Sequence, residues 1–251
     1  MQINKQMAGV TSGRYKVIHL VRHAEGIHNV EVDKNKKALF SPSLSDAQLS
    51  PLGWKQVTER RREVHESGLL KRIELVVTSP MQRTIQTATG IFGKEHKSKH
   101  NISSPTSIAN YPPIIAFELC REQLGMYPCN RRGSVSKYIP KFPEIDFSLI
   151  ESEEDQMWQA DAMEKVEQVA ARGMQFLKWL WEREENEIAV VSHGIFLQET
   201  LLAFADNLDP SVKSKLCKRF LNCELRSVII YESEKESDKI GYAADLSKEA
   251  P

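Results

Sequence analysis

The sequence predicts a single α/β domain in which a mainly parallel sheet carries helices on both faces. Three observations lead to this fold class. A length of 251 residues suits one domain of this type. Short β-branched runs alternate along the chain with longer segments of helical periodicity. No internal repeat is visible in the sequence, so a repeat architecture is not expected.

Five short apolar runs have the composition of buried strands. They are Lys16–Arg22, Glu74–Thr78, Pro113–Phe117, Glu187–Ser192 and Cys223–Tyr231. Because helical segments separate most of these runs, neighbouring strands are expected to pair mainly in parallel.

A long polar stretch, Ala24–Leu49, leads to the first predicted helix, which begins with Pro51 at its first position. Apolar residues recur along this segment at helical spacing, so one side of the helix is expected to face the core. That side carries Trp54, Val57, Arg61 and Val64.

Three further helices are expected. Ser79 is placed to cap one of them, with Pro80 at its first position, and that helix ends at Gly93. The longest helix spans Asp161–Arg183, where apolar residues recur at helical spacing. The last, Ile195–Phe204, follows the fourth predicted strand.

The folded domain is expected to span residues 16–231. Residues 1–15 are expected to form a flexible N-terminus, and residues 232–251 a charged, disordered tail. The polar, Ser-rich segment 94–111 is typical of a surface insertion. Residues 118–153 are rich in charges and proline and are expected to be irregular.

The charges of the chain balance, with 34 Lys and Arg against 34 Asp and Glu. Bulk attraction to nucleic acid or to an anionic membrane is therefore not expected. The most apolar window, residues 188–205, is interrupted by His193, Gln198 and Glu199, which argues against a membrane span. Residues 1–16 lack the apolar core of a secretory signal. These features predict a cytoplasmic protein with neither nucleic acid nor membrane as a partner.

The four cysteines lack the spacing of a metal or redox site. No CxxC pair and no CxxC…HxxxH pattern occurs, so neither structural zinc nor a thioredoxin-like motif is expected. In a cytosolic protein, reduced thiols are the expected state. The cysteines are Cys120, Cys129, Cys217 and Cys223.

Chemically active residues follow four of the predicted strands. In parallel sheets, ligands bind beyond the carboxyl ends of the strands, so these residues are expected to gather at one edge. In chain order, they are Arg22, His23, Glu25, His28 and Asn29, then Ser79 and Arg83, then Glu118, Arg121 and Glu122, and finally Ser192, His193 and Gly194.

This set of residues suits phosphoryl transfer. Two guanidinium groups and helix N-termini can bind phosphoryl oxygens. A neutral imidazole can attack phosphorus, and a carboxylic acid can protonate the leaving alcohol and then activate water. The sequence shows no acidic cluster that would suggest Mg²⁺, and GxxxxGK[ST] is absent, so a nucleoside triphosphate machine is not expected.

Three phrases carry a family resemblance: Leu20-Val-Arg-His-Ala-Glu25, Thr78-Ser-Pro-Met-Gln-Arg83-Thr and Val191-Ser-His-Gly194. They resemble the histidine phosphatase (phosphoglycerate mutase-like) superfamily. Longer phrases, among them IHLVRHAEGIHNVE, ELVVTSPMQRTIQTA and CREQLGMYPCNRR, look like its plant phosphoglycerate mutase-like branch. The resemblance extends over nearly the whole chain, from Val17 to Ile230.

The resemblance implies a role for each matching residue. His23 matches the nucleophile that becomes phosphohistidine, and Arg22 before it matches a phosphate ligand. Asn29 and Arg83 match residues that contact the same phosphate. The fold implied is that of the phosphoglycerate mutase-like proteins.

Other matches complete the implied pocket. His193 matches its second histidine, and the following Gly194 can present a backbone N–H. Glu122 most resembles the proton donor, with Glu118 as the alternative. Apart from the resemblance, His28 is placed where it can line the pocket mouth.

Arg131 and Arg132 resemble an arginine pair that some members use on a distal anion of the substrate. A solvated loop pair is the alternative. The pocket walls are expected to come from residues 94–111 and 120–143, whose aromatic residues would make a partly apolar pocket. A sugar phosphate, a nucleotide or a hydrophobic alcohol phosphate, such as a prenyl phosphate, all remain open as substrates.

The sequence thus predicts a phosphatase that hydrolyses a small soluble phosphate ester through a phosphohistidine on His23, with no metal and no cofactor. Two alternatives stay open. A phosphomutase would return the phosphoryl group to another hydroxyl, but the chain lacks the extended segment that encloses phosphoglycerate in glycolytic mutases. A non-catalytic phosphate sensor or binding module could use the same fold. The oligomeric state is not predicted.

Overall fold

The computed structural model describes residues 14–94, 111–206, 209–231 and 241–242. The predicted insertion 94–111, the N-terminus 1–15 and the tail 232–251 lie almost wholly outside these residues. Tyr15 already belongs to the first strand, and Gly241 and Tyr242 form a short strand. At these residues the predicted terminal segments are wrong, because main-chain pairing with the sheet holds both.

The described strands form one sheet in the order β4-β3-β2-β5-β1-β6-β7. Their bounds are β1 Tyr15–Arg22, β2 Leu75–Thr78, β3 Ile114–Ala116, β4 Ile145–Asp146, β5 Glu187–Ser192, β6 Leu225–Tyr231 and β7 Gly241–Tyr242. From β4 to β1 every pairing is parallel, and β6 and β7 are antiparallel additions at one edge. The prediction of a mainly parallel α/β sheet is therefore confirmed.

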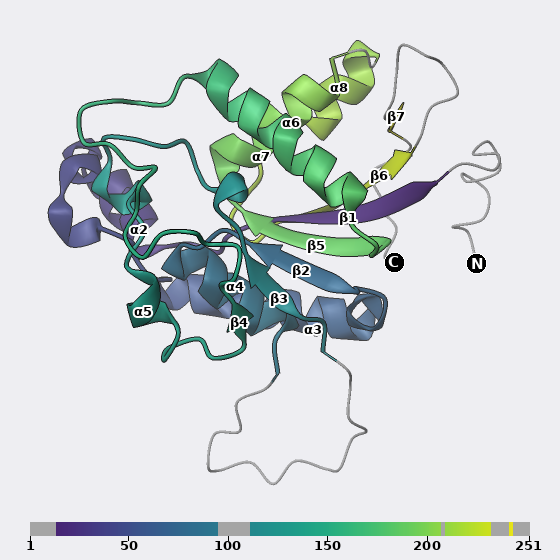
Figure 1. The fold of residues 1–251 in the computed structure, drawn as a ribbon, viewed down its shortest axis with the longest axis horizontal. Helices are drawn as coiled ribbons and strands as arrows, with labels where there is room; N and C mark the ends of the chain where they lie inside the picture. Colours follow the sequence, from purple (N-terminus) through teal and green to yellow (C-terminus); the bar gives the residue numbers. More distant parts are fainter. Residues whose placement is uncertain (1–13, 95–110, 207–208, 232–240, 243–251) are drawn as a thin grey trace, which may run out of the picture.

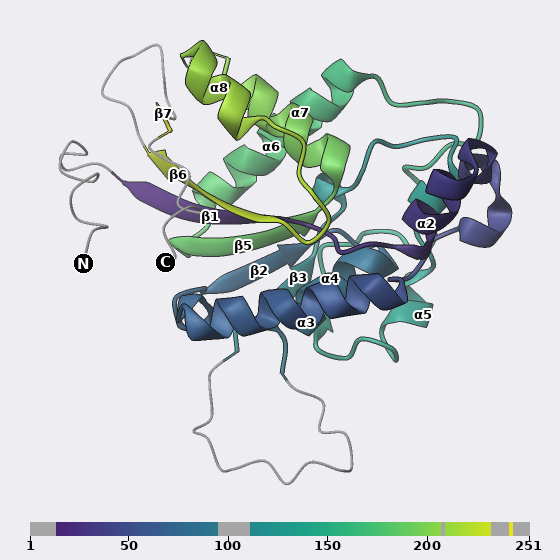
Figure 2. The same cartoon turned by 180° about the vertical axis from the view of Figure 1, so that it is seen from behind.

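Helices cover both faces of the sheet (Figure 1, Figure 2). Their bounds are α3 Pro51–Glu66 and α4 Gln82–Phe92 on one face, and α6 Val166–Glu182, α7 Gly194–Phe204 and α8 Pro210–Leu216 on the other. Each face encloses its own apolar cluster. One includes Val57, Ile85 and Phe92, and the other includes Phe176 and Leu197.

Helix α3 begins as predicted. The Ser50 side chain accepts a hydrogen bond from the Gly53 backbone N–H at 3.0 Å, and Pro51 occupies the first helical position. Val57 and Val64 are buried, but Trp54 remains 44% exposed, so the predicted buried side is wrong at that residue.

Helix α4 begins at Gln82, three residues after the predicted cap Ser79. Tertiary contacts explain the difference. The Ser79 backbone N–H extends the pairing with β5 by donating to Val191, and its hydroxyl bonds His193. Asp46 instead accepts a hydrogen bond from the Gln82 backbone N–H at 2.8 Å. The predicted end at Gly93 is confirmed.

Helix α6 begins at Val166, five residues later than predicted. An isolated bridge between Gly125 and Met163 holds the preceding segment in an extended form. Gly125 has a φ of +107°, and a Cβ there would lie 1.9 Å from the Ala162 carbonyl oxygen, so only glycine permits this approach.

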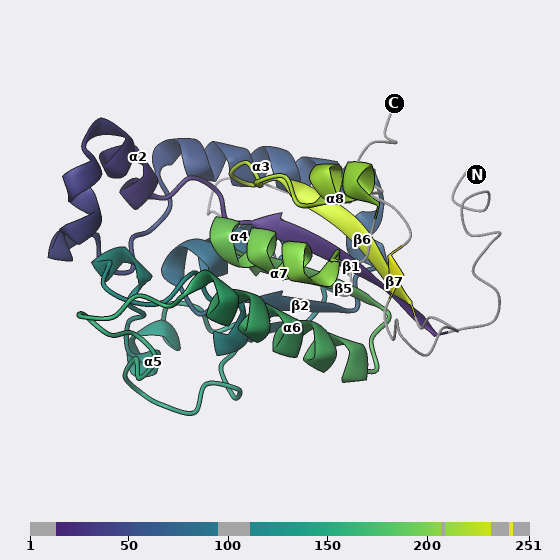
Figure 3. The same ribbon diagram turned by 90° about the horizontal axis from the view of Figure 1, so that it is seen from above.

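The polar stretch 24–49 contains elements that the sequence did not reveal: α2 Ile27–Lys34, η2 Lys36–Phe40 and η3 Pro42–Leu44. Other short elements are η4 Leu69–Lys71, η5 Glu118–Cys120, η6 Pro128–Asn130 and α5 Val135–Tyr138. The elements α2 and α5 lie beyond the carboxyl ends of the parallel strands (Figure 1, Figure 3). These segments therefore surround the edge where ligands of such sheets bind.

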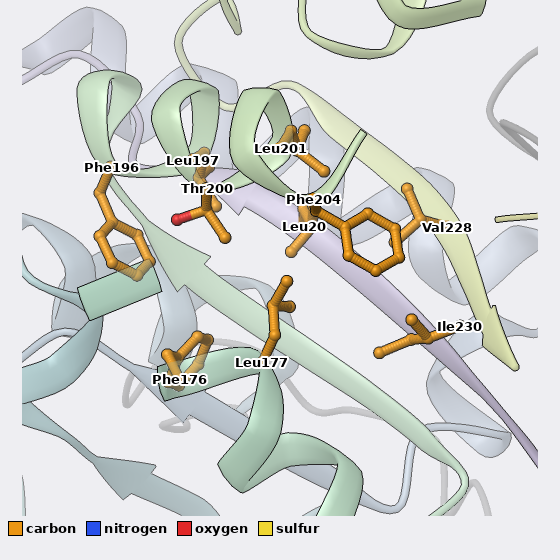
Figure 4. Close-up of a pocket in the computed structure, with 10 residues that line it drawn as sticks. All are labelled: Leu20, Phe176, Leu177, Phe196, Leu197, Thr200, Leu201, Phe204, Val228 and Ile230. Atoms are coloured by element: carbon orange, nitrogen blue, oxygen red, sulfur yellow. The ribbon is translucent and has the colours of Figure 1, made fainter. Parts of the chain in front are cut away.

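A small cavity of about 10 Å³ lies between α6, α7 and the sheet (Figure 4). Nine of its ten lining residues are apolar, and the tenth is Thr200. The cavity has room for about one water molecule, so we regard it as a packing defect rather than a ligand site. None of the helices in the described ranges combines the length and the apolar character needed to cross a bilayer.

Candidate active site

Two histidines meet because β1 and β5 are parallel neighbours. Arg22 of β1 pairs with Ser192 of β5, so His23 and His193 follow at adjacent strand ends. The His23 backbone N–H donates to the Ser192 carbonyl at 2.9 Å. The two imidazole centroids lie 5.2 Å apart, and both side chains are buried. The predicted gathering of these residues at one edge is confirmed.

Strand β2 brings the second arginine. Thr78 of β2 pairs with Val191 of β5, and the next residue, Ser79, bonds His193 Nε2 through its hydroxyl at 2.8 Å. Arg83 lies in the first turn of α4 and is 1% exposed. Its charge and that of Arg22 both act on His23.

Arg83 is held by backbone and amide oxygens. Its Nη1 donates to the Cys129 carbonyl at 2.7 Å, and its Nη2 donates to Asn130 Oδ1 at 3.2 Å. Asn130 in turn donates through Nδ2 to the Gln123 carbonyl. Element η6 therefore orients the guanidinium, a role the sequence did not reveal because residues 129 and 130 lie far along the chain from Arg83.

Helix α2 brings a third histidine and the predicted asparagine. His28 is 8% exposed, and its ring centroid lies 5.6 Å from that of His23. Asn29 Oδ1 accepts a hydrogen bond from the Gly26 backbone N–H at 2.9 Å. This bond orients the Asn29 amide with its nitrogen as the remaining donor. His28, predicted at the pocket mouth, thus lies beside the proposed nucleophile.

Gly194 opens α7 directly against Arg22. A Cβ at this position would lie 3.3 Å from Arg22 Nε, so a side chain there would crowd the guanidinium. Glycine therefore lets Arg22 lie close to the N-terminus of α7, where backbone N–H groups favour an anion.

Four buried nitrogen atoms in this cluster have no hydrogen-bond partner among the described residues. They are Arg22 Nε, His28 Nδ1, Arg83 Nε and His193 Nδ1. Buried polar atoms in folded proteins are normally paired, so a group of unpaired ones marks a place where a ligand supplies the partner. Because both guanidinium groups are cationic, an anion with several oxygens fits best.

The three imidazoles are held neutral. Burial lowers the pKa of His23 well below its usual value, and Arg83, His28 and Arg22 lower it further. Burial followed by Arg83 likewise lowers the pKa of His28 and of His193 well below the usual range. A protonated imidazole would face two guanidinium groups in a desolvated site.

The hydrogen bonds of His23 select one tautomer. Its Nδ1 lies 2.7 Å from the carbonyl oxygen of Ala24, which can only accept, so Nδ1 carries the proton. The lone pair is then on Nε2, which makes this nitrogen the nucleophilic atom.

Residues 220–223 also form hydrogen bonds with the end of β1, and the sequence did not indicate these contacts. Arg22 Nη1 donates to the Phe220 carbonyl at 2.8 Å, and Asn222 Nδ2 donates to the His23 carbonyl at 3.1 Å. The Cys223 backbone N–H reaches the carbonyls of both Arg22 and His23. Cys223 has a φ of +59°, which is unusual for this residue and is imposed by the turn.

Glu122 lies at the N-terminus of α7, next to the histidine cluster. Its Oε1 accepts from the Phe196 backbone N–H at 3.1 Å, and its Oε2 lies 3.4 Å from the Ile195 nitrogen. Burial lowers the pKa of Arg22 and of Arg83, and the negative charge of Glu122 acts against this by favouring their cationic forms. The carboxylate is therefore in position to reach a group bound between the arginines and the helix.

Glu118 occupies a different place. It forms ion pairs with Arg121 at 3.0 Å and with Arg132 at 2.8 Å. Of the two acids that the sequence left open, Glu118 pairs with arginines, whereas the Glu122 carboxylate binds backbone N–H groups at the start of α7, directly after His193. The geometry therefore favours Glu122 as the proton donor.

Arg131 and Arg132, which the sequence grouped as a pair, lie in different environments. Arg132 is 2% exposed and donates to Glu118 and to the carbonyls of Gly133, Ser152, Glu153 and Glu154. It supports the loop instead of facing a substrate, because these oxygens occupy its donors. Arg131 is exposed, and its guanidinium lies 5.2 Å from the ring centre of Trp158. Only Arg131 of the pair is open to an external anion.

No group of three or more His, Cys, Asp and Glu side chains among the described residues is arranged to hold a metal ion. The four cysteines are buried and free of disulfides. Burial raises the pKa of Cys129, the cysteine whose carbonyl binds Arg83, so this thiol stays protonated.

A model of the histidine phosphatase superfamily (branch 1) matches residues 18–103 and 140–241, more than half of the chain. The chain belongs to this superfamily. Phosphoglycerate mutase-like protein 1 of Arabidopsis thaliana is 50% identical over 232 residues, covering 87% of this chain and 82% of the relative. Phosphoglycerate mutase-like protein 2 of the same plant is 45% identical over 258 residues, covering 87% of this chain and 75% of the relative.

The resemblance to plant phosphoglycerate mutase-like proteins is thereby confirmed. Among solved structures, a mycobacterial glucosyl-3-phosphoglycerate phosphatase in complex with VO3 superposes with a TM-score of 0.54 at 17% identity. The match covers 90% of this chain and 96% of that structure. At this identity the likeness shows the fold, which is the phosphoglycerate mutase-like fold that the sequence predicts.

Proposed function

We propose that this protein is a metal-independent phosphatase that hydrolyses a small phosphate ester through a phosphohistidine on His23. One observation carries the proposal: the neutral His23 lies among buried nitrogen atoms that lack partners within the described chain, two of them on arginines. Such a cluster suits a phosphoryl group, because its oxygens can accept hydrogen bonds from every side.

In the first step, His23 Nε2 attacks phosphorus and the bond to the leaving alcohol breaks. Arg22 and Arg83 bind the non-bridging oxygens, together with His193, the Asn29 amide and the N-terminus of α7 at Gly194. Glu122, protonated at this stage, gives its proton to the departing oxygen. Preorganised donors in a water-poor site supply most of the barrier reduction.

In the second step, Glu122 acts as a carboxylate and accepts a proton from water. The water oxygen attacks phosphorus, the bond to His23 Nε2 breaks, and inorganic phosphate leaves. Both steps use the same donors to the phosphoryl oxygens, namely Arg22, Arg83, His193, Asn29 and the N-terminus of α7, which we call the phosphate clamp. Because the two arginines are cationic, no metal ion is needed to neutralise the phosphate. His28 lies on the other side of His23 and is assigned to substrate binding.

The acceptor of the phosphoryl group distinguishes the proposed phosphatase from a phosphomutase. The mutase alternative matters because the two plant relatives are named "phosphoglycerate mutase-like". Both reactions pass through phosphohistidine, and the difference is whether water or a second hydroxyl takes the phosphoryl group. We favour water because the chain lacks the extended segment that encloses the substrate in glycolytic mutases.

Turnover of an aryl phosphate, with trapping of the labelled enzyme, tests the proposal. Wild type is expected to release inorganic phosphate and to form an acid-labile, base-stable phosphoenzyme. Replacement of the nucleophile, His23→Ala, is expected to abolish both. Label on serine or cysteine, or turnover by the alanine variant, contradicts the mechanism.

Chelation provides a second test of the same proposal. Activity is expected to be unchanged after exhaustive treatment with a chelator, since the positive charge of the site comes from Arg22 and Arg83. Loss of activity that a divalent ion restores would show that the clamp is incomplete without metal. Binding of inorganic phosphate without turnover of any ester would instead favour a sensor.

A further inference from the structure

The backbone around Glu122 converges on one side chain of another helix. Arg172, on α6, is 7% exposed. Its Nη1 donates to the carbonyls of Leu119 and Arg121, each at 2.8 Å, and its Nη2 donates to the Glu122 carbonyl at 3.2 Å. One guanidinium thus holds three carbonyls within a stretch of four residues.

Glu164 fixes this guanidinium in turn. Its two carboxylate oxygens accept from Arg172 Nε at 2.9 Å and from Arg172 Nη2 at 2.7 Å, a bidentate pair. One of them also accepts from the Leu124 backbone N–H at 2.9 Å. The Gln123 side chain donates to the Glu164 carbonyl at 2.7 Å. The loop is therefore held on both sides of Glu122.

The same guanidinium also contacts the helix that binds the Glu122 carboxylate. It lies 5.0 Å from the ring centre of Phe196, whose backbone N–H donates to Glu122 Oε1. Arg172 therefore contacts both the main chain of Glu122 and the residue that holds its side chain. These contacts fix both ends of the Glu122 side chain relative to α7.

We propose that Arg172, held by Glu164, is a positioning residue that sets the Glu122 carboxyl group for proton transfer to the leaving alcohol. This inference rests on the proposed function and on Glu122 as its acid. Arg172 has no donor turned to the phosphate clamp: the five N–H bonds described above serve Glu164 and the three carbonyls. Its effect on catalysis therefore passes through Glu122.

The geometry requires arginine at this position. A planar guanidinium offers five donors in a fixed arrangement, whereas the ammonium of lysine offers three from a single point. Lysine cannot keep the bidentate pair with Glu164 and also bind three carbonyls. The variant Arg172→Lys therefore retains the buried charge and loses the orientation of the loop.

The test compares an alkyl phosphate, whose leaving group needs protonation, with an activated aryl phosphate, whose leaving group does not. For Arg172→Lys, kcat on the alkyl phosphate is expected to fall about 10- to 100-fold, the scale of a misplaced catalytic group. Formation of the phosphoenzyme from the aryl phosphate is expected to change much less. Glu122→Gln sets the reference for complete loss of the acid.

Arg226 offers a matched control within the chain. It is also buried, pairs with Glu224, binds the carbonyls of Leu216, Lys218 and Arg219, and lies over a phenylalanine ring. Arg226→Lys therefore costs a comparable set of contacts away from Glu122. Its alkyl-to-aryl rate ratio is expected to equal that of wild type, even where its melting temperature falls as far as that of Arg172→Lys.

Glu164→Gln is the second variant and serves where Arg172→Lys does not fold. It keeps an oxygen for Leu124 and removes the ion pair, and its rate ratio is expected to shift in the same direction as that of Glu122→Gln. A normal ratio in both the Arg172 and Glu164 variants, while Glu122→Gln shifts it, overturns the positioning role alone. If Glu122→Gln leaves the ratio unshifted, Glu122 is not the proton donor, and the positioning role of Arg172 fails with it. If wild type has no phosphatase activity, the proposed function itself is overturned.

Discussion

Two groups of arginines, of which Arg22 is partly buried and the others buried, lie within the same part of the molecule but differ in how their donors are used. Arg22 and Arg83 form no ion pair with a described carboxylate, and each has an Nε without a described partner. Arg121 and Arg172, in contrast, form ion pairs with Asp155 and Glu164, whose side chains are buried and mostly buried, and also bind backbone carbonyls. The first pair flanks His23, and the second holds the loop that carries Glu122.

This difference distinguishes arginines that are available to a ligand from arginines that stabilise the fold. A buried cation without a counter-ion costs stability, so the fold keeps it only where a ligand completes its bonds. A buried cation whose partners are all internal loses much when one partner is removed, because the other is left unpaired. Substitutions in the two groups should therefore have opposite consequences for activity and stability.

The largest effect on stability is expected from Arg121→Met. Arg121 binds Asp155 through both Nη atoms, at 2.7 and 2.6 Å, and the Asp155 side chain is fully buried. Burial alone would raise the pKa of Asp155, but the hydrogen bonds from Arg121 hold it below the usual value. Loss of the cation is expected to lower the free energy of unfolding by about 3–5 kcal/mol. Urea denaturation measures this, and a loss below about 1 kcal/mol would contradict the supporting role.

The reverse is expected for Arg83→Met. Its kcat/KM on an aryl phosphate is expected to fall about 10²- to 10³-fold, the scale for loss of one preorganised donor. The free energy of unfolding without ligand should fall by less than in Arg121→Met, about 1–3 kcal/mol, because the Cys129 carbonyl loses its donor but no ion pair breaks. Inorganic phosphate should raise the melting temperature of wild type but not of this variant. If the variant kept its activity and lost as much unfolding free energy as Arg121→Met, Arg83 would belong with Arg121 and Arg172 as a residue that stabilises the fold.

The histidines beside the unpaired arginines should make stability depend on pH. The pKa values of His23, His28 and His193 are lowered in the folded state, so below pH ~6.5 the unfolded chain binds more protons than the folded one. Stability is therefore complete above this pH and falls as the pH drops, by up to about 1.4 kcal/mol per pH unit for each histidine. His28→Gln should flatten the slope measured by urea titration between pH 5 and 7.

An unchanged slope in His28→Gln would show that this residue is not held neutral.

The smallest effect extends the comparison to hydroxyl groups. Thr200 lines the apolar cavity of Figure 4, and its Oγ1 is buried without a described partner. Thr87 Oγ1, in contrast, bonds both the Ala24 backbone N–H and the Arg83 carbonyl. Thr200→Val is expected to leave stability unchanged or to raise it by up to about 1 kcal/mol. Thr87→Val is expected to lower it by about 1–3 kcal/mol, because the Ala24 N–H is left unpaired. Equal losses in the two variants would contradict the comparison.

Local sequence signals predicted much of the fold. Strand β5 has the bounds that its β-branched run predicted, and α3 begins at Pro51 behind a Ser50 cap. Helix α6 was predicted to begin five residues too early, because apolar spacing does not show that Glu164 and Met163 are engaged elsewhere. Where tertiary hydrogen bonds compete for a residue, periodicity alone misplaces the boundary.

The sequence by itself determined that His23, Arg83 and His193 lie together, since the carboxyl ends of parallel neighbours share one edge of a sheet. Only the tertiary structure separated Glu122 from Glu118 and Arg131 from Arg132. Each of these pairs lies in an irregular segment, where no helical or strand period fixes which way a side chain points. Their contacts come instead from α6, α7 and residues 152–155, far along the chain, and those contacts exist only once the domain has packed.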